Sequence, residues 1–241
     1  MIPGPQEAQK PSVSVRAVFF DVDFTLIYPG PTFQAEGYRR ACAAHGIEVD
    51  PSTFDAATAA SSFILDEVEE QIYNHDVFIH YTASIIEKMG GRGAQVVDVA
   101  REIYDQWSVN HHFEMYDDVA PVLMELQKRG FIVGVISNSH RSLDAFCEHF
   151  SLGNIITVSV SGFEHGYMKP HRSIFAAALE RAKVTADEAM MVGDSMAHDI
   201  EGALNAGWHA VLLRRSGERP IETPAGLTVI TTLADLLAHL S

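Results

Sequence analysis

Short apolar runs alternate with stretches of helical periodicity along most of the chain, and this pattern predicts strands that alternate with helices. Buried strands are expected at 16–20, 131–136, 155–160, 189–192, 209–213 and, more briefly, 227–230. Helices are expected at 119–129, 143–150, 170–183, 199–206 and 233–240. Because alternating strands and helices build parallel sheets covered on both faces, the pattern favours an α/β fold with a doubly wound parallel sheet.

The region between the first two strands has helical spacing throughout and no strand alternation. A first helix is expected at 32–45, and two more on either side of the glycine-rich segment 90–93. We expect residues 29–114 to form a helical cap inserted in an α/β core made of 16–28 and 115–241. Insertions of this kind tend to lie over the carboxyl ends of the strands, where a helical lid can exclude water and select substrate.

Composition narrows the classes of protein that fit. The chain has 241 residues, and no apolar run is long enough to cross a membrane, so no membrane partner is expected. Its formal net charge of -15 comes without a basic stripe, which argues against nucleic acid as a partner. Residues 1–15 are expected to be a flexible lead-in without a secretory signal, and Cys42 and Cys147 to be separate reduced thiols. These features favour a cytoplasmic location.

The first candidate for chemistry is an acidic segment directly after the first strand, Asp21-Val22-Asp23-Phe24-Thr25. Residues two apart in an extended chain share a face, so Asp21 and Asp23 can project into one pocket. Two carboxylates this close repel one another unless a cation or a proton lies between them. On its own the segment fits a structural acidic turn as well as a catalytic pair.

Further polar features follow later strands or precede helices. They are Ser137-Asn138 after the second expected strand, Lys169-Pro170 at a helix start, and Gly193-Asp194 with Asp199 after the strand at 189–192. Ser137 and Asn138 can bind a phosphate oxygen, although both residue types are also common helix caps. Taken singly, Lys169 fits a surface lysine, Asp194 a turn, and Asp199 a helix cap.

Taken together, these features resemble, in their order, the motifs of the haloacid dehalogenase (HAD) superfamily of phosphohydrolases. The first motif, Asp-x-Asp-x-Thr, is met by Asp21, Asp23 and Thr25. The second is met by Ser137, the third by Lys169, and the fourth by Gly193-Asp194 followed by Asp199. The resemblance spans residues 16 to about 213, and the cap is similar to the family's helical cap in placement only. Phe24 is a departure, because many members have Gly there.

The resemblance implies a Mg²⁺-dependent phosphatase that works through an aspartyl-phosphate on Asp21, with Asp23 as general acid and base. Mg²⁺ would be held by the side chains of Asp21 and Asp194 and by the backbone carbonyl of Asp23. Lys169 would neutralise Asp21. The remaining implied roles are phosphate binding by Ser137, Asn138 and Lys169, and support of the site by Thr25 and Asp199.

Rival functions share parts of this pattern. A phosphomutase uses the same motifs but returns the phosphate to a substrate, so it stays open beside the phosphatase. A haloacid dehalogenase lacks the second aspartate of the first motif, and the presence of Asp23 argues against that branch. A receiver-like signalling module also has an acceptor aspartate on a doubly wound sheet, but no large helical insertion follows it. A binding protein without turnover fits poorly with four intact motifs.

Other polar and aromatic residues are given no role at this point. His140 and Arg141 follow the second motif and could reach a substrate, although a helix surface fits them at least as well. The pair His111-His112 could bind a metal, but a solvated linker fits it better. Aromatic residues of the cap, including Trp107, could line a substrate pocket, although aromatics at helical spacing are more often core residues. A helical lid favours a small phosphate ester over a phosphoprotein. The identity of the ester and the oligomeric state are not readable from the pattern.

Overall fold

The computed structural model describes residues 15–66, 71–215 and 223–240. Its main strands are β1 (Ala17–Phe20), β4 (Ile132–Ser137), β5 (Ile156–Ser161), β6 (Ala189–Gly193), β7 (His209–Leu213) and β8 (Thr228–Ile230). They form one parallel sheet in the order β5-β4-β1-β6-β7-β8. The predicted α/β fold with a parallel sheet is confirmed, and the first strand lies at its centre.

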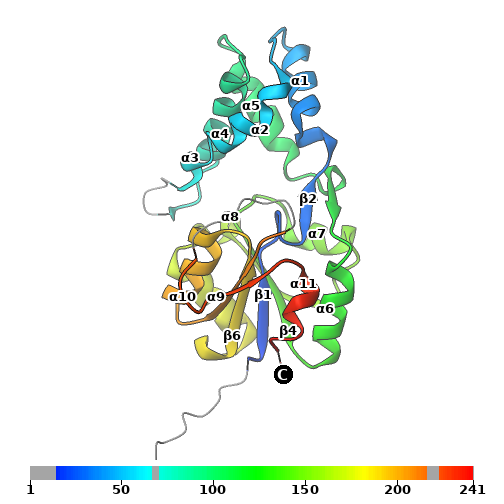
Figure 1. The fold of residues 1–241 in the computed structure, drawn as a ribbon, viewed down its shortest axis with the longest axis vertical. Helices are drawn as coiled ribbons and strands as arrows, with labels where there is room; N and C mark the ends of the chain where they lie inside the picture. Colours follow the sequence, from blue (N-terminus) through cyan, green and yellow to red (C-terminus); the bar gives the residue numbers. More distant parts are fainter. Residues whose placement is uncertain (1–14, 67–70, 216–222, 241) are drawn as a thin grey trace, which may run out of the picture.

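Helices cover both faces of this sheet. They are α6 (Val119–Lys128), α7 (Leu143–His149), α9 (Arg172–Ala182), α10 (Gly202–Asn205) and α11 (Leu233–Leu236). Side chains of β1 alternate between the two faces, so Phe19 packs in the cluster with α9 and α10, and Phe20 in the cluster with α6, α7 and α11. Figure 1 shows these two helical layers on either side of β1. The sheet is therefore doubly wound, as predicted.

The part of the chain between β1 and β4 forms a group of helices that lies over one end of the core (Figure 1). Its helices are α1 (Ala35–Ala44), α2 (Phe54–Ala59), α3 (Phe63–Asp66), α4 (His75–Lys88) and α5 (Val96–Gln106). The chain enters and leaves this group through an antiparallel pair, β2 (Ile27–Pro29) with β3 (Phe113–Met115). We call residues 29–114 the cap. That these residues form a unit separate from the core remains a proposal.

A second connection joins the cap to the core away from the β2–β3 pair. The backbone N–H of Tyr73 donates to the carbonyl of Gly166 at 2.9 Å, and the N–H of Met168 donates to the carbonyl of Gln71 at 2.8 Å. Gly166 directly follows the short helix α8 (Gly162–His165) of the core. The cap is thus held to the core on two sides.

Some element boundaries differ from those predicted. The helix expected at 170–183 begins at Arg172, because His171 is its N-cap and its side chain accepts the N–H of Ser173, so Pro170 precedes the helix. The helix expected at 199–206 is split into a π-helical segment, η6 (Met196–Glu201), and α10. These shifts affect the loops that carry the candidate site more than the sheet.

No helix of the described residues is long and apolar enough to cross a membrane. The predicted flexible lead-in at 1–15 falls, except for Val15, outside the residues that the structure describes.

Candidate active site

The predicted motifs meet at the carboxyl ends of three adjacent strands. Asp21 directly follows β1, Ser137 ends β4 and Gly193 ends β6, and the parallel pairing brings these strand ends together. A cavity of about 480 Å³ opens above them, between the core and the cap. The predicted residues that line it are Asp21, Asp23, Asn138, Lys169, Asp194 and Asp199. Ser137 and Thr25 do not line the cavity and are fully buried beside residues that do.

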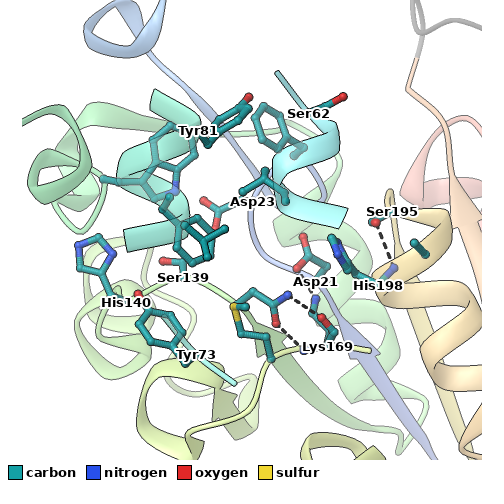
Figure 2. A pocket seen from close by; sticks show the side chains of 18 of the residues that line it. Asp21, Asp23, Ser62, Tyr73, Tyr81, Ser139, His140, Lys169, Ser195 and His198 are labelled. Atoms are coloured by element: carbon teal, nitrogen blue, oxygen red, sulfur yellow. Dashed lines mark hydrogen bonds and ion pairs between the residues drawn. The ribbon is translucent and has the colours of Figure 1, made fainter. Parts of the chain in front are cut away.

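A buried lysine lies between two carboxylates on the floor of this cavity. Nζ of Lys169 donates to Oδ1 of Asp21 at 2.5 Å and to Oδ1 of Asp199 at 2.6 Å, as Figure 2 shows in part. Burial lowers the pKa of Lys169, but the charges of Asp199 and Asp21 outweigh this effect and raise it above its ordinary value. Lys169 therefore keeps its positive charge at neutral pH, in contact with the predicted nucleophile.

Asp199 approaches the end of β6 closely because residue 193 is a glycine. Oδ2 of Asp199 accepts the N–H of Ser195 at 3.0 Å, and a Cβ added to Gly193 would lie 2.2 Å from the same oxygen. Asp199 lies within the π-helical segment η6, which carries it into this position. It does not cap an ordinary α-helix, the alternative that the sequence offered for it. With both oxygens engaged, Asp199 holds Lys169 in place.

Three acidic side chains form a cluster that could hold a cation. Asp21, Asp194 and Asp199 each have an oxygen within 4.8 Å of the others. Burial, followed by the charge of Asp199, raises the pKa of Asp194 to about 7. Burial also raises the pKa of Asp21, although Lys169 opposes the shift. Oγ1 of Thr25 donates to Oδ1 of Asp194 at 3.2 Å and so orients that carboxylate. The three carboxylates therefore have too little positive charge beside them to balance their own negative charge.

The two residues at the end of β4 make different contacts. Oγ of Ser137 accepts the N–H of Ser139 at 3.1 Å, which shapes the turn after the strand. The side-chain amide of Asn138 pairs with the backbone of Lys169: Nδ2 donates to its carbonyl at 3.0 Å, and Oδ1 accepts its N–H at 2.7 Å. Asn138 thus fixes the segment that carries Lys169, a contact that the sequence did not indicate.

Asp23 is bound by Arg141, a residue to which the sequence assigned no definite role. Nη1 of Arg141 donates to Oδ1 of Asp23 at 2.8 Å, and Nη2 donates to the carbonyl of Trp107 at 2.9 Å, just after the last helix of the cap. Arg141 is 1% exposed, with its guanidinium 4.1 Å from the centre of the Phe113 ring. Of the two interpretations of Arg141, the helix surface does not fit, because α7 begins only at Leu143 and Arg141 lies in the turn before it.

His140 also lies in the turn before α7 and not on a helix surface. Its ring lines the cavity and stacks on Tyr104 of the cap at 4.2 Å between centroids. Burial lowers the pKa of His140. His140 and Arg141 therefore both face the cap. The sequence feature that could have indicated this is their place in a turn directly after a strand that ends at the site.

A second arginine without a sequence signal supports the loop of the first motif. The guanidinium of Arg215 donates to both carboxylate oxygens of Asp118, at 3.1 Å each, and to the backbone carbonyl of Thr25 at 2.8 Å. It also lies 3.5 Å from the centre of the Tyr116 ring. Arg215 ties the acidic segment to the return from the cap, where Tyr116 and Asp118 follow β3.

A family model described as a haloacid dehalogenase-like hydrolase matches residues 15–207. The chain belongs to the haloacid dehalogenase-like hydrolase family. The resemblance predicted from the motifs is thus confirmed, and so is the expectation that the chain is an enzyme of the hydrolase class.

Relatives of this HAD-like hydrolase include named phosphatases. The chain is 28% identical over 217 residues to the glyceraldehyde 3-phosphate phosphatase of Methanopyrus kandleri, covering 86% of this chain and 88% of the relative. It is 29% identical over 241 residues to the N-acylneuraminate-9-phosphatase of Mus musculus, covering 94% of each. Among solved structures, a HAD-hydrolase of Bacillus subtilis described as bound to magnesium has a similar fold, with a TM-score of 0.74 at 17% identity, covering 95% of this chain and 99% of the other.

Proposed function

We propose that this hydrolase is a Mg²⁺-dependent phosphatase that cleaves a small-molecule phosphate monoester through an aspartyl-phosphate on Asp21. The observation that carries the proposal is the contact of Lys169 with Asp21 beside the carboxylate of Asp194. A carboxylate that attacks an anionic phosphate needs positive charge gathered in this way. The two relatives named as phosphatases support the same activity.

The residues present fit a hard divalent cation. Asp21 and Asp194 offer carboxylate oxygens within 4.8 Å of one another, and Mg²⁺ prefers oxygen ligands. The raised pKa values of both groups indicate buried negative charge that Lys169 alone does not balance. We assign Mg²⁺ to these two side chains and to the backbone carbonyl of Asp23. When bound, the ion would stabilise negative charge on the phosphoryl group.

The proposed reaction has two steps. In the first, Asp21 attacks phosphorus in line, its new O–P bond forms as the ester P–O bond breaks, and Asp23 gives a proton to the departing oxygen. In the second, Asp23 removes a proton from water, which attacks the phosphoryl group and releases phosphate and the Asp21 carboxylate. Lys169 and the hydroxyl and backbone groups at Ser137 and Asn138 would hold the phosphoryl oxygens.

The cap would act as the lid of this site. We propose that residues 29–114 enclose the substrate, with the β2–β3 pair as their attachment and the contacts of Gln71 and Tyr73 on the other side. A cavity of about 480 Å³ between the core and the cap fits a small ester and is too small for a folded phosphoprotein. Enclosure also removes water from the electrostatic contacts on the floor.

Release of inorganic phosphate from p-nitrophenyl phosphate and glyceraldehyde 3-phosphate tests the proposal. Release is expected with Mg²⁺ and not with EDTA, and Asp21→Asn is expected to abolish it. Asp187→Asn, which changes an exposed acid of the core, is the matched control. Phosphate that appears on an added sugar phosphate, and not in solution, would indicate a phosphomutase. No release with any divalent metal would overturn the proposal.

A further inference from the structure

We propose that the cavity selects a phosphate monoester whose alcohol carries a flat apolar ring and no second anionic group. The inference rests on the proposed phosphatase function and deepens it, since it concerns the part of the substrate that leaves. It comes from the walls of the cavity, which the motifs do not determine.

The part of the cavity away from the charged floor is lined by rings. Phe78 and Tyr81 come from α4, Tyr104 from α5 and Trp107 from the residue after it, while Phe24 comes from the loop after β1. Figure 2 shows Tyr81 across the cavity from Asp21 and Lys169. A leaving group that points away from a phosphorus atom near Asp21 must therefore extend among aromatic side chains.

Several of these rings lie nearly parallel. The ring of Phe78 is 21° from that of Tyr104, with centroids 6.0 Å apart, and Tyr104 is 23° from His140 at 4.2 Å. The series runs from the cap, through Tyr104, to the core residue His140. A flat ring of the substrate can pack against such a series in offset stacking, whereas a hydroxyl-rich chain would lose water there without regaining hydrogen bonds.

The titratable rings of the described aromatic wall are also uncharged at physiological pH. Burial raises the pKa of Tyr81 to about 12, and it raises the pKa of Tyr104 as well, so both phenols stay protonated. Burial lowers the pKa of His140, so its imidazole is neutral. These groups provide apolar surface and a few hydroxyls, but no charge for a substrate to pair with.

Within the described lining, permanent positive charge is found only on the floor. Among the described residues that line the cavity, Lys169 is the only lysine or arginine, and its ammonium already contacts Asp21 and Asp199. A second anionic group on the substrate would be taken out of water beside Asp23, with no lysine or arginine among the described residues of the far wall. The lining therefore selects against carboxylated or doubly phosphorylated alcohols.

Phe24 is an independent sign of a ligand at this wall. Its φ of 66° is left-handed, a conformation that disfavours any side chain with a Cβ, yet the position holds a phenylalanine that is 44% exposed. The ring lies 6.4 Å from that of Trp107 and lines the cavity. A large apolar ring, left exposed on a strained loop next to the nucleophile, is placed to contact the substrate.

The test compares kcat/KM, with Mg²⁺, for benzyl phosphate, 4-carboxybenzyl phosphate and glyceraldehyde 3-phosphate. The first two have closely similar leaving alcohols, so their ratio reports the carboxylate and not the chemistry. Benzyl phosphate is expected to be better than each of the others by about tenfold or more. Phe78→Ala is expected to lower this preference, while His80→Ala, an exposed position on the same helix, leaves it unchanged.

A charge substitution gives the sharpest comparison. Val77→Lys, at a half-buried position that lines the cavity, is expected to raise the ratio of 4-carboxybenzyl to benzyl phosphate. Because every comparison is a ratio within one protein sample, it does not depend on the fraction that is folded. Equal or better turnover of the carboxylated ester by the unchanged protein would overturn this inference and leave the phosphatase standing. No phosphate release from any of the esters would overturn the phosphatase and this inference with it.

Discussion

Nη1 of Arg141 lies 2.8 Å from Oδ1 of Asp23, while Nη2 of the same guanidinium holds the carbonyl of Trp107 in the cap. One buried side chain thus contacts both the proposed general acid and the segment by which the cap returns to the core. Since a guanidinium is always charged and presents its donors in a fixed fork, it fixes the orientation of Asp23 more firmly than a lysine would. We infer that Arg141 is a positioning residue for Asp23.

Arg141→Met is expected to weaken proton transfer to the leaving group. The kcat for an alkyl phosphate such as benzyl phosphate should fall about 100-fold, whereas that for p-nitrophenyl phosphate should fall less than about tenfold. The reason is that nitrophenolate leaves without needing a proton. Steady-state kinetics on the two esters measures the split, with Arg129→Met, a surface arginine of the core, as the control. Asp23→Asn should give the same split, and the double variant should add little. An equal fall on both esters would mean that Arg141 has only a structural role.

The acidic cluster predicts how the stability of the metal-free protein depends on pH. Asp194 has a pKa of about 7 when folded, above its ordinary value of 3.8, so the folded state binds this proton more tightly than the unfolded state. Stability is then greatest below the lower value and falls as the pH rises from about 4 toward about 7. Bound Mg²⁺ compensates the buried negative charge of the ionised cluster, so it should raise Tm more at pH 8 than at pH 5.

Thermal unfolding in EDTA and in Mg²⁺ between pH 5 and pH 8 measures this difference. Asp194→Asn removes the titrating group, so this variant should lose most of the Mg²⁺ effect and should be more stable than the unchanged protein in EDTA at pH 8. A Mg²⁺ effect of the same size at both pH values would contradict the assignment of the cation to this cluster.

More of the charged floor of the cavity than of its aromatic walls could be predicted from the sequence, for physical reasons. Asp21, Lys169 and Asp194 follow strands or precede helices, and parallel strands bring their carboxyl ends together, so motif order alone places them near one another. Arg141 carries no such signal, because its burial depends on Phe113 and Trp107, which reach it only through the fold of the cap. The cap aromatics show helical spacing, and that spacing does not tell a ring in a core from a ring on a cavity wall.

Gly193→Ala tests the close approach of Asp199 to the sheet. The new Cβ would lie 2.2 Å from Oδ2 of Asp199, and β6 is central and paired on both sides, so the carboxylate must move and release Lys169. We expect a loss of about 1–3 kcal/mol in the free energy of unfolding, with a large fall in kcat. Urea denaturation and phosphate release measure the two effects. Gly153→Ala is the matched control, since nothing lies within 4 Å of its added Cβ and its φ is not left-handed. Unchanged activity in Gly193→Ala would show that Asp199 does not need this position.

Phe24→Gly separates the backbone at residue 24 from the ring that it carries. Glycine relieves a left-handed φ that costs about 1–2 kcal/mol. Glycine also increases the conformational entropy of the unfolded chain, which lowers the free energy of unfolding by about 0.5–1 kcal/mol, so the net change in stability should be within about 1 kcal/mol. Loss of the ring should lower kcat/KM for benzyl phosphate several-fold relative to glyceraldehyde 3-phosphate. Phe24→Leu keeps an apolar side chain on the same strained backbone, and should recover part of the preference without a gain in stability. If Phe24→Gly instead kept the full preference for the ring-bearing ester, residue 24 would shape only the loop, and the selection would have to come from Phe78, Tyr81 and Tyr104 alone.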